Sequence, residues 1–281
     1  MAHILVIGGA GGLGSAVVHK LLARGDQVSV SVLNEREAAS VREATPGVQA
    51  IHTLDMSDAV AVRGALSSAL ANGPALDGVV VCAAIAPLGP LETTGLDVIR
   101  RTIEINCVSD IAIFQAALPA LRKTRGRLVF VSSMAGIAAM PFIGAYVTSK
   151  FALEGAADVM RQEAAPQGVK VVLVEPGGIK TPMVSQQLEE VAARLKSLDG
   201  EERQRYGYLY RGFEAAASQG HNNDSSTPEQ IADVVIAALD AEAPEARYAA
   251  GPDAEQLIAL ARSGDAQLDA AMAGMFGSPD A

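Results

Sequence analysis

A tyrosine and a lysine four residues apart, Tyr146 and Lys150, are the side chains of this sequence best suited to proton chemistry. Residues at positions i and i+4 share one face of a helix, so this spacing brings a phenol next to an ammonium group. The positive charge stabilises the phenolate, which makes the phenol a usable acid or base near neutral pH. The interconversion of an alcohol and a carbonyl needs such a group, because a proton must be delivered to the oxygen or removed from it.

The spacing alone is also compatible with a surface pair on a helix, so the neighbouring residues matter. Ser133 follows an apolar run at 127–132 and would emerge at the carboxyl end of a strand, where the sites of open α/β sheets lie. Its hydroxyl could bind the substrate oxygen beside Tyr146. Ser132 is the alternative, and we interpret it as a structural hydroxyl.

A glycine-rich segment lies between the first apolar run and the first helical pattern. Its candidate cofactor-binding residues are Gly8, Gly11, Gly12, Leu13 and Gly14. Glycines permit a tight turn and let backbone amides approach a pyrophosphate, and the following helix N-terminus favours negative charge. A purely structural turn is the alternative, but the position between a strand and a helix favours a dinucleotide site.

The residues after the second apolar run should lie beside the adenosine ribose. An acid there favours NAD and a basic residue favours NADP, but the expected position holds Val32 and Leu33, which supply neither. Leu33 and the following Asn34 remain candidate cofactor-binding residues. Arg36 is a candidate phosphate partner or a solvated residue of the first helical turn. The missing acid gives a slight preference for NADP over NAD. After the third run, Asp55 and Met56 could contact the adenine, or Asp55 could cap the next helix.

Apolar runs alternate with amphipathic stretches along most of the chain. Candidate strands cover 3–7, 27–33, 48–54, 78–82, 127–132, 170–175 and 248–250, and candidate helices cover 13–24, 35–44, 58–70, 96–122, 146–164 and 228–239. The last helix has a start signal in Thr227, Pro228 and Gln230. This alternation predicts an α/β fold, a doubly wound parallel sheet with helices on both faces.

The segment 183–226 breaks the alternation. It has helical patterns, charges and four aromatic residues, and it ends in a polar loop at 221–226. We expect one domain over 1–281 in which this insertion is a helical lid over the substrate. A peripheral helical pair or an oligomer contact is the alternative.

The composition excludes several classes of function. A formal net charge of −10 disfavours binding to nucleic acid. Cys82 and Cys107 are 25 positions apart without further cysteine or histidine ligands nearby, so we expect neither a metal site nor a disulfide. The uncharged run at 128–149 is interrupted by Pro, Gly and Ser, so no membrane span is expected. We expect a cytoplasmic protein.

Together these motifs resemble the short-chain dehydrogenase/reductase family. The family's T-G-x-x-x-G-[IL]-G pattern matches Gly8, Gly12, Leu13 and Gly14, with Ile7 in place of the threonine. Its asparagine matches Asn106, and its serine, thirteen residues before the tyrosine, matches Ser133. Its Y-x-x-x-K is Tyr146 and Lys150. Its P-G-x-[IV]-x-T matches Pro176, Gly177, Ile179 and Thr181. The match spans about residues 3–182.

The resemblance implies a seven-stranded Rossmann-type sheet and a proton relay through Asn106, Lys150 and Tyr146. Lys150 would also hold the nicotinamide ribose, and Ile179 and Thr181 would lie beside the carboxamide. The family's N-N-A-G after the fourth strand is here Val81, Cys82, Ala83 and Ala84. The small residues still let the backbone pass close to the cofactor, but both asparagines are absent.

The sequence around Pro176 and a C-terminal Arg-Tyr-x-x-Gly-x-Asp, from Arg247 to Asp253, resemble the hydroxysteroid and retinol dehydrogenase branch. That branch implies a small hydrophobic alcohol or ketone as substrate, and the family implies homodimers or homotetramers through the helices at 96–122 and 146–164. Two other functions are compatible with the fold. A non-catalytic dinucleotide sensor has no use for the relay residues, and an epimerase or dehydratase usually has a longer chain.

Overall fold

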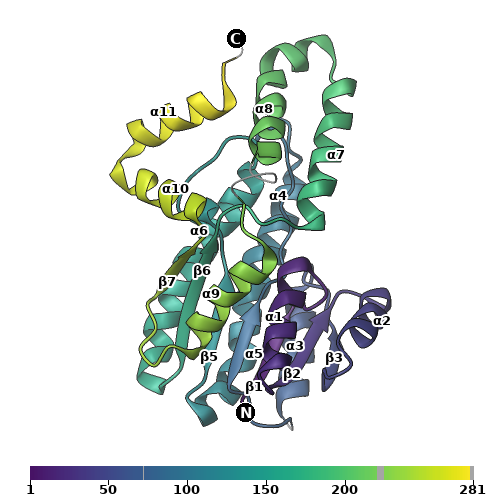
Figure 1. The fold of residues 1–281 in the computed structure, drawn as a ribbon, viewed down its shortest axis with the longest axis vertical. Coiled ribbons are helices and arrows are strands. Elements are labelled where there is room, and N and C mark those ends of the chain that lie inside the picture. The colour runs from purple at the N-terminus through teal and green to yellow at the C-terminus, as the bar shows by residue number, and fades with distance from the viewer. Residues whose placement is uncertain (72, 220–224, 279–281) are drawn as a thin grey trace.

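The computed structural model describes residues 1–71, 73–219 and 225–278 and has one sheet of seven parallel strands at its centre (Figure 1). The strand order is β3-β2-β1-β4-β5-β6-β7, so the winding reverses between β1 and β4. The strands are β1 (His3–Ile7), β2 (Gln27–Val32), β3 (Ala50–Thr53), β4 (Gly78–Val81), β5 (Arg127–Val131), β6 (Lys170–Pro176) and β7 (Arg247–Ala250). The predicted doubly wound, seven-stranded sheet is confirmed, and each predicted strand is present within two residues at either end.

The residues of β1 alternate between two hydrophobic cores, one on each face of the sheet. The covering helices are α1 (Gly12–Ala23), α2 (Glu35–Ala44), α3 (Ala59–Ala71), α5 (Ser109–Thr124), α6 (Gly144–Ala164) and α9 (Pro228–Asp240). Leu5 and Ile7 pack in one core with α3, α5 and α6, whereas Ile4 and Val6 pack in the other with α1, α2 and α9. A parallel sheet covered on both faces explains why its strands are continuous apolar runs.

The predicted start signal of α9 is confirmed as a capping box. The Thr227 hydroxyl accepts a hydrogen bond from the Gln230 backbone at 3.3 Å, and Gln230 Oε1 accepts one from the Thr227 backbone at 2.8 Å. Pro228 occupies the first helical position. These local contacts satisfy donors that the first helical turn would otherwise leave free.

The segment 96–122, predicted as one helix, is interrupted. It forms α4 (Leu96–Ile103), a π-helical turn η1 (Glu104–Val108) that contains Asn106, and then α5. Such turns occur mostly as single insertions in α-helices and often at functional sites. The whole stretch Leu96–Thr124 is long and apolar enough to cross a membrane, but 56% of its most apolar window is buried in the protein, and a core helix passes the same test.

Two helices fill most of the predicted insertion, namely α7 (Pro182–Ser197) and α8 (Gly200–Gln219). Figure 1 shows them beyond the carboxyl ends of the strands, on the same side as α10 (Pro252–Ser263) and α11 (Asp265–Phe276). A third hydrophobic cluster includes Phe142, Val191, Tyr210, Leu257 and Phe276. The insertion is therefore packed onto the body, and its action as a lid stays a prediction. Residues 221–224 of the predicted polar loop lie outside the described residues.

Candidate active site

Tyr146 and Lys150 lie in the first two turns of α6, which begins at Gly144. Lys150 is 1% exposed, and its Nζ donates a hydrogen bond to the carbonyl oxygen of Val131 at 2.9 Å. The same Nζ lies 5.8 Å from the centroid of the half-buried Tyr146 ring. The end of β5 therefore fixes a buried ammonium group beside the phenol, as the i, i+4 spacing predicts.

Asn106 is fully buried and makes three hydrogen bonds with its side chain. Its Oδ1 accepts one from the backbone N–H of Ile85 at 2.9 Å, and its Nδ2 donates to the Ile85 carbonyl at 2.8 Å and to Ser149 Oγ at 3.0 Å. Ser149 Oγ in turn donates to the Tyr146 carbonyl at 2.7 Å. Asn106 thus joins the segment after β4 to the turn of α6 that carries Tyr146 and Lys150. Sequence reasoning missed Ser149, although it lies within the Tyr-x-x-x-Lys motif.

Ser133 lies two residues after the end of β5 and caps a short 3₁₀ turn, η2 (Met134–Gly136). Its Oγ accepts a hydrogen bond from the Ala135 backbone at 3.1 Å, which leaves the hydroxyl proton available for a substrate oxygen. Helix α6 packs against this turn. Ser132 is 3% exposed, which suits its alternative interpretation as a structural hydroxyl.

The backbone of the glycine turn is packed so tightly that side chains at its glycines would clash. A turn of this kind suits a dinucleotide site, which needs close approach of the backbone to the pyrophosphate. Gly8 has a φ of +81°, and a Cβ there would be 2.9 Å from the Ala83 backbone nitrogen. A Cβ on Gly14 would be 2.1 Å from the Gly8 carbonyl oxygen. The residue before α1 is Gly11, so no side chain caps this helix at that position. The backbone N–H groups of its first turn therefore remain available to bind an anion. The turn lies at the reversal between β1 and β4, where open α/β sheets bind their ligands.

The segment after β6 faces the same turn. A Cβ on Gly12 would be 3.1 Å from Thr181 Cγ2, so the first turn of α1 and the residue preceding α7 are close neighbours. The N–H of Gly177 donates to the Ala250 carbonyl at 3.1 Å, and that of Gly178 donates to Asp253 Oδ2 at 2.7 Å. Ile179 forms an isolated bridge with Ser226. The structure thus places Thr181 beside the glycine turn, whereas the contacts of Ile179 and Thr181 with a nicotinamide carboxamide stay predictions.

An acid of α2 that sequence reasoning missed is hydrogen-bonded to the residue that follows β2. Glu37 Oε2 accepts a hydrogen bond from the Leu33 backbone at 2.8 Å, and Asn34 Oδ1 caps α2 by accepting from the Glu37 backbone at 3.0 Å. The Asn34-x-x-Glu37 spacing, close to a capping box, was the available signal. Arg36 is exposed in the first turn of α2. The roles of Leu33, Asn34 and Arg36 toward a cofactor stay predictions.

The ends of β3 and β4 hold the remaining predicted cofactor residues. Asp55 is exposed, and hydrogen bonds from Ser57 lower the pKa of its carboxyl. Met56 is buried, and its carbonyl accepts from Ser109 Oγ at 2.7 Å. Burial raises the pKa of the Cys82 thiol to about 12, so it stays protonated at neutral pH.

Two further features bear on ligands. A cavity of about 290 Å³ lies between the loop after β4 and helices α7 and α8, with Leu88, Val98 and Phe142 in its wall together with Arg194 and Tyr210. Within the described part of the chain, no group of three His, Cys, Asp or Glu side chains is arranged to hold a metal ion.

Comparisons with known proteins agree with this geometry. A human 17-beta-hydroxysteroid dehydrogenase type 6 is 30% identical over 90% of this chain and 81% of its own. An NADPH-dependent 3-dehydrocapnine reductase from Ornithobacterium rhinotracheale is 30% identical over 90% of this chain and 89% of its own. A short chain dehydrogenase from Burkholderia cenocepacia, solved in complex with NADP, superimposes with a TM-score of 0.72 at 23% identity, over 99% of this chain and 98% of its own.

The hydroxysteroid dehydrogenase confirms the predicted resemblance to that branch, and the solved structure confirms the fold. The sequence profile of the short chain dehydrogenase family matches residues 2–192. The predicted resemblance to the family is therefore confirmed, and the chain belongs to the short-chain dehydrogenase/reductase family of oxidoreductases.

Proposed function

We propose that this protein is an NAD(P)-dependent ketoreductase or alcohol dehydrogenase that interconverts a hydrophobic secondary alcohol and its ketone, or handles an aldehyde. The observation that supports it most is the placement of Lys150, which is buried, bound to the Val131 carbonyl and fixed beside the Tyr146 ring. A sensor that only binds a dinucleotide has no need for an ammonium group held against a phenol.

In the proposed mechanism, Tyr146 is the general acid and base. Its phenol gives a proton to the carbonyl oxygen in reduction and takes one from the alcohol in oxidation. Lys150 stabilises the phenolate form by its charge. Ser133 donates a hydrogen bond to the same substrate oxygen, and Asn106 keeps the turn of α6 in place. The cofactor would supply or accept the hydride.

The turn from Gly8 to Gly14 would hold the cofactor pyrophosphate, and the segment from Pro176 to Thr181 would hold its nicotinamide end. We propose NADP as the preferred cofactor. A relative that is named NADPH-dependent and a neighbouring structure solved with NADP support this preference. Arg36 is the basic residue at the end of β2 that could pair with the 2′-phosphate.

The cavity beside α7 and α8 supports the proposed class of substrate. Leu88, Val98 and Phe142 offer an apolar surface, and Phe142 is four residues before Tyr146 on the chain. Tyr210, Glu190 and the ion pair of Arg194 with Glu202 add polar groups at the wall contributed by the insertion. A compact apolar ketone that carries a polar substituent matches this mixture.

The test has two stages. First, NADPH and NADH are titrated separately and followed by their fluorescence; then a panel of ketones, aldehydes and alcohols is assayed with the tighter cofactor. Tyr146→Phe is expected to abolish turnover and to leave cofactor binding nearly unchanged. Full turnover in Tyr146→Phe would contradict the mechanism. Tight cofactor binding without turnover of any compound by the wild type would favour the sensor.

We also propose a cytoplasmic homodimer or homotetramer. Helices α5 and α6 have partly exposed apolar side chains, with Phe151 44% and Val159 53% exposed. Light scattering coupled to gel filtration measures the oligomeric state. Phe151→Asp should produce a monomer if α6 forms the contact, and a wild-type monomer contradicts the proposal.

A further inference from the structure

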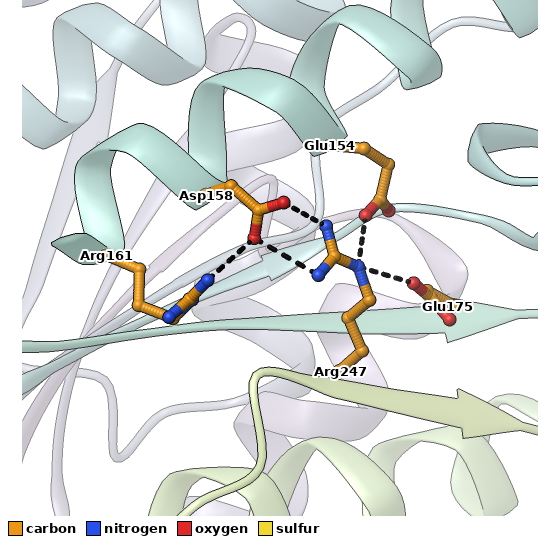
Figure 2. A network of polar contacts seen from close by, with 5 residues as sticks. All are labelled: Glu154, Asp158, Arg161, Glu175 and Arg247. Carbon is orange, nitrogen blue, oxygen red and sulfur yellow. Dashed lines mark hydrogen bonds and ion pairs between the residues drawn. The ribbon is translucent and has the colours of Figure 1, made fainter.

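Arg247, the first residue of β7, binds three carboxylates from two other elements (Figure 2). Its Nε donates to Glu154 Oε2 of α6 at 2.9 Å and lies 3.3 Å from Glu175 Oε1 of β6. Its Nη1 and Nη2 donate to the two oxygens of Asp158 at 3.1 and 2.9 Å. A planar guanidinium suits this arrangement, because its donors point in fixed directions.

The cluster is partly buried and has more acids than bases. The side chains of Glu154 and Glu175 are 7% and 2% exposed. Arg161 joins at the rim, where its Nη2 lies 3.1 Å from Asp158 Oδ1 (Figure 2). Three carboxylates thus share the guanidinium of Arg247, whose side chain is 24% exposed, and that of Arg161 at the edge. Removing Arg247 leaves the buried carboxylates of Glu154 and Glu175 without this partner, which is unfavourable.

Each partner of Arg247 belongs to a segment that carries candidate site residues. Glu154 follows Lys150 by one turn of α6, and Glu175 directly precedes Pro176 and Gly177. Glu154 also lies against the end of β5, because a Cβ on Gly136 would be 2.9 Å from both Glu154 Cγ and Ser132 Oγ. The cluster therefore joins α6, which carries Tyr146 and Lys150, to the end of β6, which leads into the proposed nicotinamide-side turn.

The far end of β7 binds the same turn. Ala250 accepts the Gly177 N–H, and Asp253 accepts the Gly178 N–H. The C-terminal Arg-Tyr-x-x-Gly-x-Asp stretch therefore contacts the 176–178 turn through Asp253 and anchors β7 to α6 through Arg247. This gives a structural role to a motif that the proposed chemistry does not use.

We propose that Arg247 is a positioning residue, whose ion pairs hold helix α6, with Tyr146 and Lys150, in register with the cofactor-binding turn at 176–178. The proposal rests on the proposed function, because only a site that joins a catalytic pair to a cofactor needs this register. Arg247 touches neither substrate nor cofactor in this role. It acts through Glu154 and Glu175.

The acid surplus makes this register sensitive to pH. Burial, and then the charge of Glu154, raises the pKa of Glu175 to about 7, while Arg247 and the exposed Arg262 of α10 oppose the shift. The native state keeps the Glu175 proton that the unfolded chain releases near pH 4.5, so the cluster's contribution to stability decreases as pH rises toward 7. Asp158 behaves oppositely, because the hydrogen bonds from Arg247 lower its pKa.

The test compares Arg247→Met, Arg247→Lys, Glu175→Gln and the double variant Arg247→Met/Glu175→Gln. The dissociation constant of NADPH is measured by fluorescence, together with turnover of the best substrate found in the panel described above, at about pH 6 and about pH 8. Arg161→Met is the matched control, because it removes only the rim pair. We expect Arg247→Met to weaken NADPH binding by about tenfold or more, and Arg247→Lys to have a smaller effect because it cannot make the paired bonds.

At about pH 8, where Glu175 begins to ionise, the double variant should recover part of the lost affinity, since Glu175→Gln removes one unpaired charge. Glu175→Gln alone should flatten the pH dependence of NADPH affinity and thermal stability. A purely structural residue would lower the melting temperature without this charge rescue.

Equal losses in Arg247→Met and Arg161→Met, or no charge rescue, would overturn the proposal. If Arg247→Met does not fold, unchanged NADPH affinity in Arg247→Lys together with an unaltered pH dependence in Glu175→Gln overturns it. Wild-type NADPH binding without turnover would instead refute the proposed function and leave these comparisons valid.

Discussion

Asn106 Nδ2 donates a hydrogen bond to Ser149 Oγ at 3.0 Å, and this contact joins the π-helical turn to α6, the helix that carries Tyr146 and Lys150. The same amide group also binds the Ile85 carbonyl, so one side chain connects the segment after β4, the interrupted helix and α6. Because the candidate site lies where these three elements meet, the position of Tyr146 depends on the side chains of Asn106 and Ser149.

Asn106→Ala should therefore lower both turnover and stability. It leaves the partly buried N–H and carbonyl of Ile85 without this partner, at up to about 1–3 kcal/mol for each group that stays unsatisfied. Thermal unfolding and steady-state kinetics measure the two effects. Ser149→Ala is the matched control, since it removes one of the three bonds and should cost less. Wild-type melting temperature in Asn106→Ala would contradict the role assigned to its side chain.

Gly14→Ala should abolish cofactor binding. A Cβ at this position would be 2.1 Å from the Gly8 carbonyl oxygen, which is backbone and cannot rotate away, so α1 must shift from the turn. Overpacking of this kind costs about 1–3 kcal/mol. NADPH titration and thermal unfolding check the result.

Gly64→Ala is the contrasting variant. Gly64 lies in α3, and a Cβ there would meet no heavy atom of the described residues within 4 Å, so alanine should stabilise the helix by about 1 kcal/mol. If both variants bind NADPH like the wild type, the glycine turn does not depend on close backbone approach.

The strands could be predicted from sequence because a sheet covered on both faces requires apolar side chains at successive positions. All five residues of β1 are buried, and the glycines follow them at once. The start of α9 was also predictable, since its capping box is local. The π-helical turn was not, because Asn106 bonds to Ile85, which is 21 residues away. The Arg247 cluster needs partners 89 and 93 residues away, and no periodicity in one sequence indicates such pairs.

Arg36→Ala should weaken NADPH binding by about tenfold and leave NADH binding nearly unchanged, because a charge-assisted contact to a phosphate is worth about 1.5–3 kcal/mol. Arg42→Ala is the control, because Arg42 lies in the last turn of α2 and pairs with Glu35. Fluorescence titrations with both cofactors measure the ratio. Equal loss for NADPH and NADH would place the 2′-phosphate away from Arg36.

Glu37→Gln tests the acid that lies beside this arginine. Its carboxylate accepts the Leu33 N–H at the end of β2, where negative charge would repel a 2′-phosphate. The neutral amide keeps an acceptor for Leu33, so α2 should stay folded. NADPH affinity is expected to rise and NADH affinity to stay the same or fall. A fall in NADPH affinity alone would show that the phosphate does not approach Glu37.

Asp110→Asn should stabilise the protein more at high pH than at low pH. Asp110 lies one helical turn after Asn106, is 1% exposed, and its Oδ1 has no hydrogen-bond partner within the described residues. Burial raises the pKa of this carboxyl to about 8, against an opposing effect of the Lys150 charge. The native state therefore holds a proton that the unfolded chain gives up near pH 4, so the wild type loses stability as pH rises through this window.

Asparagine has nearly the same shape and cannot ionise, so the variant escapes this loss. Its melting temperature should exceed that of the wild type by more at about pH 8.5 than at about pH 5. The exposed Asp269→Asn is the control and should show no such difference. If the advantage of Asp110→Asn is the same at both pH values, Asp110 does not change its protonation on unfolding, and its burial beside Lys150 must be stabilised as an ion pair instead.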